Sequence, residues 1–119
     1  MSRDLKTAVL DRDDFLQRVE GDMELARDLV ELFLEDLPER MSDLRQALAG
    51  SNLELVHERA HSLKGSIANF SAHPAFEAAR DLDELARSGI REGLDEAFAR
   101  LENELQRAQR ELKNLVKIS

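Results

Sequence analysis

Apolar residues recur every three or four positions through most of this chain, which is the spacing of helices that bury one face. Four long stretches carry the pattern, at about residues 22–48, 53–70, 74–87 and 91–118, and a shorter stretch precedes them at 13–19. The pattern therefore predicts helices throughout. The apolar positions of the first long stretch are Leu25, Leu29, Leu32, Phe33, Leu37, Met41, Leu44 and Leu48.

The breaks between these stretches carry residues typical of turns and helix ends. Residues 49–52 read Ala-Gly-Ser-Asn, and Asn52 is a candidate N-cap for the helix that follows. Pro74 suits the first turn of the next helix, which then stops at Ser88-Gly89. Because short connections make successive helices antiparallel neighbours, we predict an all-α fold. The expected architecture is an up-and-down antiparallel four-helix bundle with a short extra N-terminal helix.

The composition fits this bundle and excludes several classes of partner and of chemistry. A chain of 119 residues fits a single domain, 1–119, with a core over about residues 11–116. The formal net charge of −8 gives no broad attraction to nucleic acid or to an anionic membrane, so neither is an expected partner. The absence of cysteine excludes disulfides, thiol catalysis and thiolate metal sites. No apolar run approaches the roughly 20 residues of a membrane span, and the N-terminus lacks a signal-peptide pattern, so we expect a cytoplasmic protein.

The stretch at 53–70 has an unusual outer face. Its core stripe centres on Val56, Leu63 and Ile67, and His61 lies about 140° from that centre, on the solvent side. A solvated face normally carries Glu, Lys and Arg, yet this one carries small residues and histidines. The residues that share the face of His61 are His57, Lys64, Gly65 and Ala68.

This outer face suits a phosphoryl acceptor. A glycine inside a helix costs up to about 1 kcal/mol relative to alanine, so Gly65 indicates close approach by another surface. Gly65 and Ala68 leave clearance beside the imidazole, and Lys64 can bring its ammonium group to the same place. Phosphoryl transfer depends mostly on positioning and charge neutralisation, and the imidazole of histidine is largely neutral and nucleophilic at neutral pH. We therefore predict that His61 accepts a phosphoryl group.

The motif around this histidine resembles a known family. Residues 60–66 read Ala-His-Ser-Leu-Lys-Gly-Ser and resemble the AH-x-LKG-S signature of histidine-phosphotransfer (HPt) domains. Residues 33–38, 68–72 and 82–89 are similar to segments that flank the signature in this family. The resemblance extends over roughly 11–115. One departure is a serine at position 71 in place of the usual glycine, which is expected to alter how the helix ends without touching the acceptor.

The resemblance implies a phosphorelay intermediate of two-component signal transduction. A receiver domain with a phosphorylated aspartate docks on the histidine face, and the phosphoryl group moves to Nε2 of His61 and later to a second receiver aspartate. By resemblance, Lys64 supports the phosphate, and Arg87 is a second, weaker basic group. The docking face is expected to comprise His57, Ser62, Gly65 and Ala68.

The same resemblance implies what this chain lacks. The receiver, in a response regulator or a hybrid histidine kinase, is expected to bring the Mg²⁺, so the chain is expected to need no cofactor of its own. Independently of the resemblance, the sequence has no Gly-rich nucleotide loop or P-loop, so we expect a phosphocarrier without its own ATP-dependent kinase activity. A monomer is the default expectation. Related domains also occur as modules of membrane-bound hybrid sensor kinases, so the parent protein can be of that kind.

Several features have simpler interpretations. His57 and His61 form an i,i+4 pair that could hold Zn²⁺, and Glu54 and Glu58 are near in the sequence. A zinc site needs a third and usually a fourth ligand, and no H-E-x-x-H motif or cysteine is present, so no metal site is predicted. Lys64 could be a solvated lysine in a helical salt bridge, for example to Glu58. Arg87 could simply be favoured by the C-terminal end of the helix dipole. The alternative function is a non-catalytic helical module that docks a signalling partner.

Overall fold

The computed structural model describes residues 8–117, and every regular element in that part of the chain is a helix. The first helix begins and ends one residue earlier than predicted, and the predicted end of the last helix at Ile118 lies outside the described residues. The five helices are α1 (Arg12–Arg18), α2 (Met23–Ala49), α3 (Leu53–Ala68), α4 (His73–Arg87) and α5 (Leu94–Val116).

Side-chain caps fix the first three helix starts. Asp11, Asp22 and Asn52 each accept a hydrogen bond from the backbone N–H three residues later, at 3.1, 3.0 and 3.1 Å. Each cap satisfies one of the N–H groups that a helix start leaves without a partner. Asn52 is therefore the N-cap that its position in the sequence predicts. The start of α5 differs, because Gly93 precedes it in the left-handed conformation with φ of 86°, which glycine adopts at little cost.

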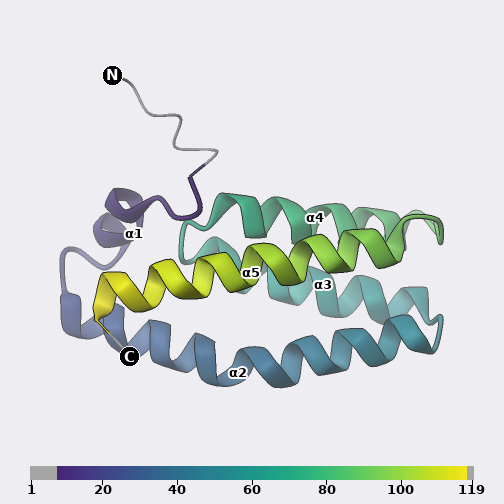
Figure 1. Cartoon of the computed structure of the whole chain (residues 1–119), viewed down its shortest axis with the longest axis horizontal. Helices are drawn as coiled ribbons and strands as arrows, with labels where there is room; N and C mark the ends of the chain where they lie inside the picture. The colour runs from purple at the N-terminus through teal and green to yellow at the C-terminus, as the bar shows by residue number, and fades with distance from the viewer. Residues whose placement is uncertain (1–7, 118–119) are drawn as a thin grey trace.

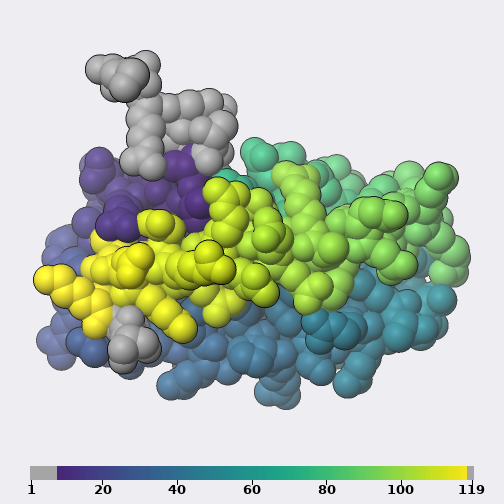
Figure 2. Space-filling model, in the orientation of Figure 1, coloured from purple at the N-terminus to yellow at the C-terminus, as the bar shows by residue number. Residues whose placement is uncertain are grey.

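The four long helices form the predicted up-and-down bundle (Figure 1). Helix α2 packs against α3 and α5, and α4 packs against α3 and α5, so the four helices enclose one core. The short α1 lies at one end of the bundle, where Phe15 packs on Phe70 with ring centroids 5.5 Å apart. Figure 2 shows the side chains of α5 closing one face of the bundle above α2.

The buried face of α2 differs from the predicted one along its N-terminal half. Ala26, Val30 and Phe33 face the core, whereas the leucines predicted there remain well exposed. Two apolar stripes run side by side on this half of the helix, roughly 90° apart. The stripe of Ala26, Val30 and Phe33 is buried, and the stripe of leucines lies on the flank of the helix. The exposed fractions are 43% for Leu25, 38% for Leu29 and 57% for Leu32.

Ser71 explains how α3 ends and how α1 is attached. The helix ends at Ala68, two residues before the predicted end, and Ser71 adopts a left-handed conformation with φ of 56°. Glycine is the residue that usually favours this conformation. Here the hydroxyl of the buried Ser71 donates a hydrogen bond to Asp14 of α1, and its carbonyl accepts one from the N–H of Asp11 at 3.0 Å. The serine therefore links α1 to the α3–α4 connection, well away from His61.

Candidate functional site

His61 lies on the outer face of α3, as the helical projection predicts. Its side chain is 64% exposed, whereas Val56, Leu63 and Ile67 of the same helix are at most 1% exposed. The core residues hold the helix in one rotational setting, because turning it would expose them. The orientation of His61 toward solvent is therefore a consequence of core packing on the opposite side of α3.

The surface one turn beyond His61 is open. Gly65 is exposed, and a Cβ built on it would meet no neighbouring atom within 4 Å. Nothing within the described part of the chain therefore requires glycine at this position for packing. Ser62 is also exposed, and Ala68 is half-buried at the end of the helix. The small residues leave space above α3 that the fold itself does not use.

A buried carboxylate lies beneath His61. Asp83 of α4 is 3% exposed, and its two carboxylate oxygens lie within hydrogen-bonding distance of three side chains of α3. Oδ1 accepts a short hydrogen bond from Nδ1 of His57. Oδ2 lies 3.2 Å from Nδ1 of His61 and 3.2 Å from Nζ of Lys64. The pairing of α3 with α4 thus places one acid at the centre of a cluster defined as His57, His61, Lys64 and Asp83, here called the Asp83 cluster.

The charge of Asp83 fixes where the protons lie. Burial alone would raise the pKa of this carboxyl, but hydrogen bonds from His57, His61 and Lys64 outweigh burial and lower the pKa below its usual range. Asp83 is therefore ionised at neutral pH and can only accept hydrogen bonds. Nδ1 of His61 consequently carries a proton, which in the neutral ring leaves the lone pair on Nε2. That nitrogen is the nucleophilic one.

Lys64 and His57 are turned inward more than the sequence suggested. The side chain of Lys64 is 22% exposed and pairs with Asp83 across the helix interface, instead of with Glu58 along its own helix. The side chain of His57 is 32% exposed, with its ring centroid 5.8 Å from that of His61. His57 therefore offers less surface to a docking partner than expected, because one ring edge faces Asp83.

Arg87 does not join the Asp83 cluster. It is exposed in the last turn of α4, one turn beyond Asp83, and no hydrogen bond or ion pair connects it to the four residues of the cluster. Since α3 and α4 are antiparallel, this turn lies nearer the start of α3 than His61 does. The geometry matches the simpler interpretation of Arg87 as a basic residue at a helix C-terminus.

Arg40 connects α2 to the histidine face. Its guanidinium donates hydrogen bonds to the hydroxyl of Ser66 at 2.7 Å and to the hydroxyl of Ser62 at 2.9 Å. Ser62 is therefore engaged with α2 as well as exposed beside His61. The contact shows which side of α2 borders the candidate site.

The exposed leucines of α2 continue this border. Residues 25, 29, 32, 36 and 40 fall on one side of a helix at about 100° per residue, so Leu25, Leu29 and Leu32 lie in line with Arg40. Leu32 is about 12 Å along the axis from Arg40, at 1.5 Å per residue. We call Leu25, Leu29 and Leu32 the α2 leucine stripe. The stripe continues the surface that carries His61, Ser62 and Gly65 beyond the end of α3.

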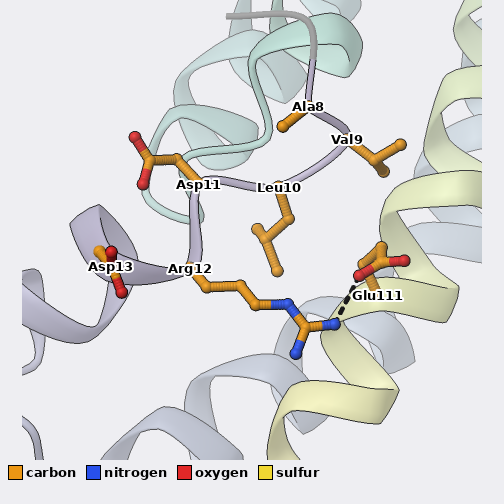
Figure 3. A pocket seen from close by; sticks show the side chains of 7 residues that line it. All are labelled: Ala8, Val9, Leu10, Asp11, Arg12, Asp13 and Glu111. Atoms are coloured by element: carbon orange, nitrogen blue, oxygen red, sulfur yellow. Dashed lines mark hydrogen bonds and ion pairs between the residues drawn. The ribbon is translucent and has the colours of Figure 1, made fainter. Parts of the chain in front are cut away.

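A pocket of about 250 Å³ lies elsewhere on the molecule, between residues 8–13 and Glu111 of α5 (Figure 3). The side chain of Arg12 extends across it to Glu111, with an N–O distance of 2.6 Å. No histidine lines this pocket, and the Asp83 cluster belongs to other helices. The candidate site is therefore an open surface and is separate from this pocket.

Two further properties concern metals and membranes. Over residues 8–117, no three His, Asp or Glu side chains are grouped so that they could hold a metal ion. None of the described helices combines the length and the apolar character that crossing a membrane requires.

Asp83 and Arg40 are not among the site residues predicted from the sequence. Asp83 could have been noticed, because it lies at the edge of an apolar stripe, between Ala79 and Ala86 on the same side of the helix. A carboxylate in such a position is rarely buried without a partner. Arg40 gives no comparable signal, because an arginine in a long polar helix is ordinary and only the packing of α2 on α3 reveals its serine partners.

Comparisons with known proteins agree with the helical-bundle fold. A family model described as "Hpt domain" matches residues 28–111, which contain the whole Asp83 cluster. A solved structure, the HPT domain from the Hpt sensor hybrid histidine kinase from Shewanella, is similar with a TM-score of 0.78 and 19% sequence identity. The alignment covers 96% of this chain and 97% of that one. Comparison with curated protein sequences gives no match.

Proposed function

The chain belongs to the Hpt domain family, the histidine-phosphotransfer modules of phosphorelays, and from this premise we propose that His61 carries the phosphoryl group. The observation that supports this assignment most is the pairing of an exposed imidazole with the buried Asp83. The carboxylate holds the proton on Nδ1, so Nε2 is available to a partner. Neither His57, which is half-buried, nor His73, at the start of α4, combines these two features.

In the proposed reaction, Nε2 of His61 attacks the phosphorus of an aspartyl phosphate on a receiver domain. The P–O bond breaks, and its electron pair stays on the receiver carboxylate while the P–Nε2 bond forms. Lys64 neutralises part of the charge near the incoming phosphate. We further propose that the domain holds no cofactor of its own and that Mg²⁺ arrives with the receiver. A second receiver then takes the phosphoryl group by the reverse exchange.

Hpt domains interact with receiver domains, and we propose that the receiver covers two adjoining surfaces here. One is the face of α3 that carries His61, Ser62 and Gly65. The other is the α2 leucine stripe, which is continuous with the first through Arg40. A standard interface buries about 800 Å² on each partner, a patch roughly 30 Å across, which is wide enough to reach from His61 to Leu25. An exposed apolar stripe next to a reactive residue is typical of a docking surface.

The remaining parts of the proposal concern the state of the protein. Hpt domains are phosphocarriers and not kinases, and we propose that this chain likewise does not phosphorylate itself from ATP. We propose that it acts as a monomer, because the α2 leucine stripe is assigned to the receiver and not to a second copy. The cytoplasmic location expected from the sequence stays part of the proposal, since it depends on where the partner receivers reside.

Profiling phosphoryl transfer from a panel of phosphorylated receivers tests the proposal. We expect at least one receiver to label the wild-type protein, His61→Gln to take no label, and ATP alone to give none. Lys64→Ala should be labelled more slowly while keeping the helical circular dichroism spectrum. The matched control is His73→Gln, which removes a histidine outside the Asp83 cluster and should be labelled normally. Labelling of His61→Gln at the wild-type rate would contradict the assignment. A receiver that binds tightly without any transfer would favour the non-catalytic docking module instead.

A further inference from the structure

The side chain of His57 takes no part in the proposed transfer of the phosphoryl group. Its Nδ1 donates to Oδ1 of Asp83, while Oδ2 of the same carboxylate serves His61 and Lys64. Asp83 is 3% exposed, so solvent does not supply the remaining hydrogen bonds of this group. Three donors from one helix thus share a single acceptor on the next helix. The arrangement couples His57 to His61 through the carboxylate of Asp83, which both side chains contact.

We propose that His57 is a positioning residue for phosphoryl transfer at His61 and that it acts through Asp83. The proposal rests on the assignment of His61 as the acceptor. His57 anchors one oxygen of the carboxylate, so that the other oxygen is held facing Nδ1 of His61. The role differs from the docking role that the sequence suggested, because the contact that carries it points into the bundle.

The physical reason lies in the freedom of an aspartate side chain. A carboxylate with one anchored oxygen cannot rotate about its terminal bond without breaking that hydrogen bond. Without His57, the charged ammonium of Lys64, 3.2 Å from Oδ2, becomes the strongest partner of Asp83. The carboxylate is then free to turn toward Lys64 and away from His61. The imidazole would lose the acceptor that fixes its tautomer, and a free imidazole samples both tautomers.

Only one tautomer can react at the exposed nitrogen. A proton on Nδ1 leaves the lone pair on Nε2, whereas a proton on Nε2 blocks attack from the solvent side. After transfer, Nδ1 keeps its proton, the ring carries a positive charge, and Asp83 balances that charge from below. When the phosphoryl group leaves, the P–Nε2 electron pair returns to the ring. No proton has to move in either direction as long as Asp83 keeps its orientation.

His57 is poorly suited to be a second acceptor. Its side chain is 32% exposed, half the value of 64% for His61. One turn beyond His61 lies Gly65, which leaves open space, but one turn beyond His57 lies His61 itself. A partner can therefore reach His61 across Gly65, whereas the side chain of His61 obstructs the corresponding approach to His57. This difference favours a supporting role over an independent phosphorylation site.

Other charged groups near the cluster do not replace this anchor. On α3, Glu58 and Arg59 are exposed, and on α4, Glu84 and Arg87 are exposed. From α2, Arg40 is engaged with Ser62 and Ser66 and not with Asp83. Within the described part of the chain, the side chains that hydrogen-bond to the Asp83 carboxylate are therefore the three from α3.

Two substitutions at one position separate the positioning role from a structural one. His57→Leu removes the donor, whereas His57→Asn keeps an N–H in about the place of Nδ1. The first measurement is ¹⁵N-detected NMR of the His61 ring in the unphosphorylated protein, which distinguishes its two tautomers. The second is the rate of labelling by a phosphorylated receiver that labels the wild type. His73→Leu is the matched control, because it removes a histidine at the other end of α4.

We expect His57→Leu to show mixed tautomers at His61 and labelling slowed by about tenfold, the lower end of the loss seen at metal sites when a partner that orients a histidine is removed. His57→Asn should restore the single tautomer and most of the rate. An unchanged tautomer in His57→Leu overturns the proposal, whether or not the rate falls, because a slower rate alone would indicate a receiver contact. Failure of His57→Asn to restore the tautomer also overturns it. Since the NMR signature needs no phosphate, it stands even if another residue proves to be the acceptor.

Discussion

The α2 leucine stripe gives a quantitative test of where the receiver docks. Its three members are 43%, 38% and 57% exposed, so about half of each side chain remains to be covered by a partner. Fully burying a leucine is worth about 1.5–3 kcal/mol, and covering the exposed half is therefore worth about 1 kcal/mol per residue. Replacing Leu25, Leu29 and Leu32 together by alanine keeps one methyl group at each position. We expect a loss of about 2 kcal/mol in binding free energy, which is roughly a 30-fold increase in Kd.

The assay is titration calorimetry with a receiver that labels the wild-type protein. Because the three positions are exposed and alanine favours helices, the thermal unfolding midpoint should change little. Ile90→Ala is the matched control: Ile90 is 46% exposed, but it lies at the α4–α5 connection, at the opposite end of the bundle from the stripe (Figure 1). A folded triple variant that binds the receiver within twofold of the wild-type affinity would refute the reasoning. A loss of affinity in Ile90→Ala as large as in the triple variant would also refute it.

Three further predictions concern the site and the fold. Gly65→Gln should fold at least as stably as the wild type, because no atom lies within 4 Å of its Cβ position and glycine is a poor helix former, yet it should slow transfer in a stopped-flow assay by obstructing the receiver. Leu63→Ala should lower the free energy of unfolding in urea by about 2–5 kcal/mol, since Leu63 is 1% exposed. The hydrogen bond from Ser71, and then the one from Arg18, lower the pKa of Asp14, so ionised Asp14 stabilises the fold above the unfolded-state value of about 3.9. That contribution is lost as the pH falls through the lowered pKa of Asp14 in the folded state. Between about pH 5 and pH 2, the free energy of unfolding in urea should therefore fall less for Asp14→Asn than for the wild type.

The fold followed from the sequence because helical periodicity and helix caps act locally. The spacing of apolar residues located each helix to within three residues at the ends that the structure describes, and Asn52 caps α3 as its position predicts. The buried face of α2 did not follow. Leu25, Leu29 and Leu32 repeat at helical spacing, and so do Ala26, Val30 and Phe33. Which stripe is buried depends on how α2 packs against α3 and α5, and that is a tertiary property.

The residues that α3 contributes to the candidate site could be predicted from the sequence, but the residue that α4 contributes could not. His61, Lys64 and Gly65 lie within five residues, so a helical projection brings them together. Asp83 comes from the next helix, 22 positions after His61, and only the register of α3 on α4 places it beneath the imidazole. The same register turns His57 and Lys64 inward. The sequence could identify an accessible nucleophile, but the group that holds its proton required the packed structure.

The identity of the phosphorylated atom tests the central claim most directly. The chain contains three histidines, His57, His61 and His73, and the account assigns the phosphoryl group to Nε2 of His61. Phosphorus–nitrogen coupling in NMR of the ¹⁵N-labelled protein, recorded at mildly alkaline pH after transfer from a phosphorylated receiver, identifies the bonded nitrogen. The account predicts a single phosphorus signal coupled to Nε2 of His61. A signal coupled to His57, to His73 or to Nδ1 of His61 would contradict it.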